Sequence, residues 1–297
     1  MGKIQDDVVC VADDVCENEG GMSGKSYEEL EFTDDFMFCK ILESQPGLCK
    51  ELAEMITEEK LGKIKADQSQ KSIRILPGGH GVRFDVFLSD GKTECDIEMQ
   101  TAVKDSLPKR SRYYQSTIDV STFEKSNDYT KLKKSFIIFI VLENPFPGWD
   151  MKKYTFVNTC REEKTLELGD DAVKIFLTPK GKKGKLSEEM EAFMSYIAEK
   201  KTDSDLTREL DKQVKIAKEG GYWRVEYMQM REKLEESKEE GRKEGIKEGI
   251  KEGRKEECSK NIKALLKSGL LSEKEIASVF NISEEEVKRL KVEMDKQ

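Results

Sequence analysis

The chain has 297 residues, of which 36% are hydrophobic and 38% are charged, and its formal net charge is -8. No segment approaches the ~18 consecutive apolar residues of a membrane-spanning helix, and the first residues carry neither the basic nor the apolar stretch of a secretion signal. The seven cysteines form no C-x-x-C pair, and a single histidine, His80, excludes every site that needs two histidines. We therefore expect a cytoplasmic protein, without a membrane span, whose chemistry depends on carboxylates.

Acidic residues are concentrated near the N-terminus. Residues 1–35 contain two lysines and eleven aspartates or glutamates, so residues 36–297 together carry a charge of +1. Residues 1–26 also lack hydrophobic periodicity, which predicts a disordered acidic leader. Residues 101–135 contain eight basic and four acidic residues, which predicts a patch where a phosphate backbone could bind.

The central part of the chain alternates between helical and strand patterns. Apolar residues recur at helical spacing after Thr33, a candidate N-cap, and Pro46 divides this region into two helices. Alternating segments at 73–76, 82–88 and 93–100 predict short strands, and Asp90 with Gly91 predicts the turn of a hairpin. Further patterns predict a helix over 106–123, a strand buried on both faces over 136–142, strands over 154–157 and 173–177, and helices from Ser187 onward. This order predicts an α/β core over residues 27–230.

The composition changes at Arg231. Residues 231–257 contain nine basic and ten acidic residues, with glycine at every fourth position from 241 to 253. We expect residues 231–260 to form a charged helical tail, which is either a solvated spacer or a helix whose glycines allow close approach of a second copy in a homodimer. In residues 261–297, S-x-x-E capping boxes that start at Ser272 and Ser283 predict a small helical module.

The hairpin carries an unusual group of acids. With Asp90 and Gly91 as the central turn residues, positions whose numbers sum to 181 face each other. One face then holds Val82, Phe84, Val86 and Leu88 with Thr93, Cys95, Ile97 and Met99, and the other holds Arg83, Asp85 and Phe87 with Glu94, Asp96, Glu98 and Gln100. Asp85 lies opposite Asp96 and diagonal to Glu98, where two carboxylates can share a hard cation such as Mg²⁺. The alternative is that this polar face is simply exposed to solvent.

Three segments in chain order carry a family resemblance. They read D-D-F-M-F-C-K, R-F-D-V-F-L-S-D-G-K-T-E-C-D-I-E-M-Q and L-P-K-R-S-R-Y-Y-Q-S-T-I-D. Together they resemble the recombination-promoting nuclease and transposase family of the PD-(D/E)XK nuclease superfamily, and the resemblance extends from Phe32 to the C-terminus. It implies a restriction-endonuclease-like core with a mixed sheet flanked by helices, and metal-dependent hydrolysis of phosphodiester bonds in DNA.

The resemblance also implies roles for single residues. Asp85 and Glu98 match the motif acids that hold Mg²⁺, and the main-chain carbonyl of Met99 would be a further ligand. Gln100 stands where the superfamily usually has lysine; its amide can orient a water molecule but cannot take up a proton. Asp35 matches an acid that superfamily members often add from the first helix, although an acid there would equally complement the helix dipole.

The helix after the acidic strand supplies candidate DNA contacts. Lys109, Arg110 and Arg112 would bind phosphates, and Gln115 lies about one turn beyond Arg112, so both could face the site. The alternative is an ordinary exposed helix face. We therefore expect an Mg²⁺-dependent DNA endonuclease, and the rival hypothesis is a catalytically weak or inactive DNA-binding or assembly protein that keeps the nuclease fold.

Overall fold

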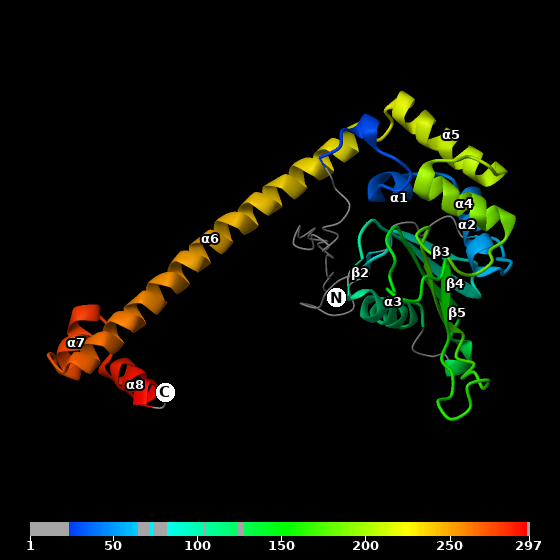
Figure 1. Ribbon diagram of the computed structural model, residues 1–297. Helices are drawn as coiled ribbons and strands as arrows, with labels where there is room; N and C mark the ends of the chain where they lie inside the picture. Colours follow the sequence, from blue (N-terminus) through cyan, green and yellow to red (C-terminus); the bar gives the residue numbers. More distant parts are fainter. Residues whose placement is uncertain (1–23, 65–71, 74–81, 104, 124–127, 296–297) are drawn as a thin grey trace, which may run out of the picture. The chain divides into compact units, whose positions relative to one another are not determined.

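The computed structural model describes residues 24–64, 72–73, 82–103, 105–123 and 128–295 (Figure 1). The chain forms two compact units, one extending to Arg231 and the other comprising Glu232–Gln297. Most of the predicted leader, residues 74–76 of the first predicted strand and His80 lie outside the described residues.

The first unit is built on a five-stranded mixed sheet, which confirms the predicted fold class. The strand order is β3 (Val86–Ser89), β4 (Thr93–Gln100), β5 (Lys134–Val141), β7 (Ala172–Leu177) and β6 (Lys153–Phe156). The pairs β4–β5 and β5–β7 are parallel, whereas β3–β4 and β6–β7 are antiparallel. A separate short pair joins β1 (Ser72–Ile73) to β2 (Val82–Arg83).

Strand β5 lies at the centre of this sheet. Every residue from Ser135 to Val141 is buried, as the continuous apolar run in the sequence predicts. Phe136, Ile138 and Ile140 pack in a cluster on one face. Ile137, Phe139 and Val141 pack in a second cluster on the other face. The sheet therefore needs helices on both sides.

Helices cover the two faces of the sheet unequally (Figure 1). On one face lie α1 (Asp35–Ser44), α2 (Pro46–Thr57), α4 (Glu188–Glu199) and α5 (Asp205–Gly220), and on the other lies α3 (Leu107–Thr122). Short 3-10 turns occur at η1 (Tyr27–Glu29) and η2 (Tyr129–Lys131). Helix α1 begins after Asp34, one residue later than the predicted cap at Thr33, and Pro46 opens α2, where its missing N–H costs nothing.

The hairpin register differs from the prediction by two residues. Val86 pairs with Ile97 and Ser89 with Glu94, so paired numbers sum to 183. The turn is centred on Gly91 and Lys92, because the side chain of Asp90 accepts hydrogen bonds from the backbone of Lys92 and Thr93, and Gly91 adopts a φ of 92°. This shift brings position 85 opposite Glu98 instead of Asp96.

The predicted strand over 82–88 is also broken at Phe84 and Asp85. Val86 and Leu88 face α1 and α2, as expected. Val82 and Phe84 instead pack with α3, contrary to the predicted single apolar face. The break reverses the alternation of side chains, so that Phe84 and Asp85 no longer follow the pleat of β3.

Charged repeats form part of α6 (Arg224–Ser268). Helices α7 (Glu273–Phe280) and α8 (Glu284–Asp295) follow, and both predicted capping boxes are confirmed by hydrogen bonds from Ser272 and Ser283 to Glu275 and Glu286. In the second unit the end of α6 packs with α7 and α8 around Ile262, Ile276, Ala277 and Val287. Among the described residues, no helix is both long and apolar enough to cross a membrane.

We predict that Gly245→Ala and Gly249→Ala each stabilise α6. A methyl group added at either position meets no atom within 4 Å, and glycine costs about 1 kcal/mol relative to alanine within a helix. Thermal unfolding followed by circular dichroism at 222 nm should show the gain. Gly221→Ala is the matched control and should destabilise the protein, because Gly221 has a φ of +61°. Loss of stability together with loss of a dimer in light scattering would instead show that the α6 glycines pack against a second copy.

Candidate functional site

Two reciprocal hydrogen bonds join Asp85 to strand β4. The backbone N–H of Asp85 donates to Glu98 Oε1 at 3.0 Å, and the backbone N–H of Met99 donates to Asp85 Oδ2 at 3.1 Å. Both acids are buried, with 4% of Asp85 and 0% of Glu98 exposed. The structure thus brings the two predicted motif acids together and fixes the direction of each carboxylate.

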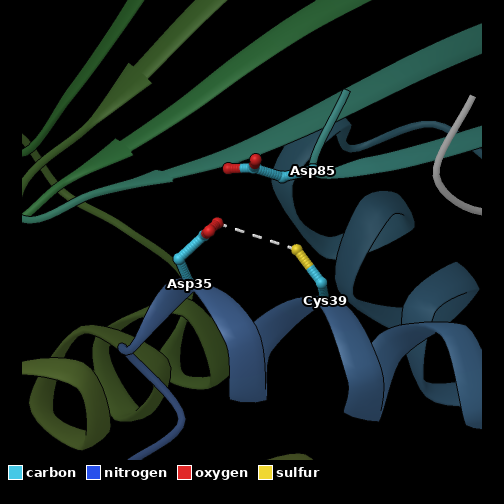
Figure 2. Close-up of side chains that lie close together, drawn as sticks. All are labelled: Asp35, Cys39 and Asp85. Atoms are coloured by element: carbon cyan, nitrogen blue, oxygen red, sulfur yellow. Dashed lines mark hydrogen bonds between the residues drawn. The ribbon is translucent and has the colours of Figure 1, made fainter. Parts of the chain in front are cut away.

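Helix α1 adds two further ligand atoms beside Asp85 (Figure 2). Asp35 is the first residue of α1, and Cys39 follows one turn later on the same side of the helix. The Cys39 thiol donates to Asp35 Oδ1 at 3.7 Å, and ligand atoms of Asp35, Cys39 and Asp85 lie within 4.8 Å of one another. The structure therefore places Asp35 beside Asp85, and the role of Asp35 as a metal ligand stays a prediction. Cys39 was not among the predicted site residues, although its spacing of four residues from Asp35 was a usable signal.

Arg110 lies inside the site and is not a surface phosphate contact. Its Nη2 pairs with Glu98 Oε2 at 2.6 Å, and its Nη1 donates to Gln100 Oε1 at 3.2 Å. Its Nε donates to the Tyr114 hydroxyl at 2.8 Å. This placement corrects the prediction that Arg110 faces DNA, because only 19% of its side chain is exposed and its donors are directed at the motif residues.

Gln115 also differs from the prediction. Its side chain is buried and donates through Nε2 to Ser135 Oγ. Ser135 pairs with Glu94 near the start of β4, whereas Gln100 lies at the end of that strand. Gln115 is therefore placed at the far end of the sheet from the motif acids and does not line the site. Lys109 and Arg112 are exposed on α3, so their predicted DNA contacts remain a proposal.

Asp96 is a buried acid beside the motif acids, and no role was predicted for it. It is 0% exposed, and neither carboxylate oxygen accepts a hydrogen bond from any described residue. Burial, then the nearby Glu98 and Asp85 carboxylates, raise the pKa of Asp96 well above its ordinary value. Burial therefore favours the neutral form of the Asp96 carboxyl.

Burial also controls the protonation of the motif acids. It raises the pKa of Asp85 well above its usual range, and the neighbouring Glu98 and Asp35 carboxylates act in the same direction. Burial raises the pKa of Glu98 to about 7, although the Arg110 guanidinium and the Asp85 N–H oppose that shift. Such a concentration of carboxylates in a covered site favours a bound cation, since a divalent ion would offset their mutual repulsion.

The donor atoms fit a hard divalent cation. Carboxylate oxygens of Asp35 and Asp85 converge in the cluster, and Glu98 is held beside Asp85. Both Glu98 oxygens already accept one hydrogen bond, but each carboxylate oxygen has a second lone pair for a metal. Met99 donates its N–H to Asp85, and its carbonyl as a ligand stays a prediction. The Cys39 sulfur is a softer donor than Mg²⁺ prefers.

Comparison with known proteins identifies one family. A family model described as PD-(D/E)XK nuclease family transposase matches residues 35–253. The matched region contains the whole sheet from β3 to β7, together with Asp35, Asp85, Glu98 and Gln100. No curated protein and no solved structure matches the chain.

We predict that the metal-free protein loses stability as pH rises because of Glu98. Its pKa in the folded state, about 7, exceeds the value of 4.5 for a free glutamate. The folded state therefore binds more protons between these values, and the stabilisation present below about pH 4.5 is lost as pH rises through about 7. Urea unfolding in EDTA between pH 4.5 and 7.5 would measure the effect, with Glu98→Gln as reference. Parallel curves for the two proteins would contradict the prediction.

Proposed function

The chain belongs to the PD-(D/E)XK nuclease transposase family. Because membership of this family supports a nuclease-like function, we propose that the protein is a metal-dependent DNA endonuclease. The observation that carries this proposal is the pair of reciprocal hydrogen bonds between Asp85 and strand β4. These bonds hold together the two buried acids that we assign to the family motif. The reaction class is hydrolysis of a phosphodiester bond.

In this proposal Asp85, Glu98 and Asp35 hold Mg²⁺, with the Met99 carbonyl as a further ligand. When bound, the ion supplies positive charge for the attacking water and the phosphate oxygens. The protein residues fix the geometry, since Asp85 and Glu98 are already oriented by backbone hydrogen bonds. Gln100 orients the attacking water or a phosphate oxygen through its amide, but it has no basic group that could accept the water's proton.

Lys109 and Arg112 are the proposed DNA contacts. Both are exposed on α3, which carries Arg110 on the side that meets Glu98. Exposed lysine and arginine gain affinity for DNA by neutralising phosphates and releasing counterions. DNA would therefore pass along the N-terminal part of α3, next to the motif acids.

The rival function is a catalytically weak or inactive nuclease-fold protein that binds DNA or serves assembly. Two observations favour it: Gln100 replaces the usual lysine, and Arg110 already pairs with Glu98. A homodimer formed through the C-terminal tail belongs to either function, and the glycine substitutions in α6 test it. A cytoplasmic location and a role in DNA recombination complete the proposal.

We predict that Asp85→Asn and Glu98→Gln abolish Mg²⁺-dependent nicking of supercoiled plasmid. Metal charge stabilisation is worth several kcal/mol in a transition state, so each rate should fall at least about a hundredfold. Both replacements keep the shape of the side chain, so the fold should persist. Glu199→Gln, an exposed change on α4, is the control. Nicking at the wild-type rate by either folded site variant would exclude the proposed centre.

We predict that Lys109→Gln combined with Arg112→Gln weakens DNA binding without removing the metal site. Two lost phosphate contacts should reduce the slope of log K against log salt by roughly 1.8, at about 0.9 per contact. Fluorescence anisotropy with duplex DNA in EDTA, from 50 to 200 mM salt as an approximate range, would measure the slope. Arg208→Gln with Lys212→Gln on exposed α5 is the matched control. An unchanged slope in the α3 variant would place the DNA path elsewhere.

A further inference from the structure

The side-chain amide of Gln100 is held in one orientation by a residue from a different element. Gln100 ends β4, whereas Arg110 lies in the first turn of α3. Nη1 of Arg110 donates to Gln100 Oε1 at 3.2 Å, and Nη2 of the same guanidinium pairs with Glu98 Oε2 at 2.6 Å. The planar fork of arginine thus joins two motif residues, which a lysine ammonium cannot do with the same geometry.

Arg110 is itself held rigidly. Its Nε donates to the Tyr114 hydroxyl at 2.8 Å, and its guanidinium carbon lies 4.9 Å from the centre of the Tyr114 ring and 5.6 Å from that of Phe139. Tyr114 is one helical turn beyond Arg110, and Phe139 belongs to the central strand β5. The guanidinium is therefore positioned by the helix and the sheet together.

This arrangement determines which way the NH₂ group of Gln100 points. Because Oε1 accepts from Arg110, the amide cannot turn over without opposing its NH₂ group to the guanidinium. Nε2 of Gln100 is buried and has no hydrogen-bond acceptor among the described residues. A buried donor without an acceptor is costly, and such groups concentrate where a ligand completes them.

We propose that Arg110 is a positioning residue of the nuclease site, which fixes the Gln100 amide so that Nε2 donates to the attacking water or to a phosphate oxygen. This inference rests on the proposed nuclease function. Arg110 acts through Gln100 and does not itself contact DNA. It differs in this respect from Lys109 and Arg112, although all three lie within one turn of α3.

A double-substitution cycle in the full-length protein tests the coupling. Arg110→Lys keeps the positive charge beside Glu98 but loses the fork, and should lower kcat for plasmid nicking by about tenfold to a hundredfold, the usual effect of losing an outer partner of a metal site. KM for DNA should stay within about twofold of the wild-type value, because the substitution does not change a contact that binds DNA equally in the ground state and the transition state. Gln100→Ala should lower kcat similarly, and the double variant should be no slower than Gln100→Ala alone. Arg208→Lys on exposed α5 is the control.

Gln100→Glu tests the Nε2 donor of the amide separately from its Oε1 acceptor. A glutamate keeps an acceptor for Arg110 but has no NH₂ group, so the protein should fold and kcat should fall as in Gln100→Ala. Multiplicative effects in the double variant, or full activity of Gln100→Glu, would overturn the inference in a protein that cuts DNA. An inactive wild type with Mg²⁺ or Mn²⁺ would instead overturn the proposed function.

The orientation of the amide has a readout that does not depend on cleavage. The Nε2 protons of Gln100, assigned by their loss in Gln100→Ala, should give an NMR signal pair that broadens or exchanges faster with solvent in Arg110→Lys. Arg208→Lys should leave that pair unchanged. Identical signals and exchange rates in wild type and Arg110→Lys would overturn the positioning role, whether or not the protein cuts DNA.

Discussion

The site depends on the interruption of the strand pattern at Phe84 and Asp85, between β2 and β3. Phe84 packs against the ring of Tyr114, with centroids 5.3 Å apart, on the face covered by α3. The next residue, Asp85, exchanges hydrogen bonds with β4 and has its carboxylate beside Asp35 of α1. A regular strand would place Phe84 on the same face as Val86, towards α1, and Asp85 on the face covered by α3. The break lets a phenylalanine in the core anchor the backbone while the adjacent carboxylate reaches both β4 and α1.

Sequence patterns predicted most of the helices and strands, because local features of the sequence determine where these elements begin and end. The run in β5 is buried on both faces, and Pro46, Ser187 and Ser272 stand at helix starts in the structure as in the pattern. The motif acids were identified by resemblance, and their proximity survived an error in register. A shift of two residues preserves which side of the strand a residue faces, so Glu98 and Asp96 stayed on the predicted side.

One local contact and one tertiary contact explain two differences between the predictions and the structure. The turn is centred one residue later than expected because the Asp90 side chain bonds the backbone of Lys92 and Thr93. In the sequence, Arg110 is indistinguishable from a basic residue on the surface. In the structure it pairs with Glu98, which lies twelve positions earlier on another element. Basic residues in a helix of mixed polarity look alike in sequence. Only the distance to a buried carboxylate distinguishes the one that turns inward.

The glycine repeat of α6 has a consequence for how this chain can vary. The four-residue repeats Gly245–Glu248 and Gly249–Glu252 are exposed and belong to no hydrophobic core. One added repeat would lengthen the helix by about 6 Å and advance the next residue by about 40° around the axis. Because no core residue is displaced, gain or loss of a repeat should be nearly neutral for folding. Repeat number can therefore change without loss of a core contact, whereas a single inserted residue at Phe84 would displace Asp85 from its hydrogen bonds with β4.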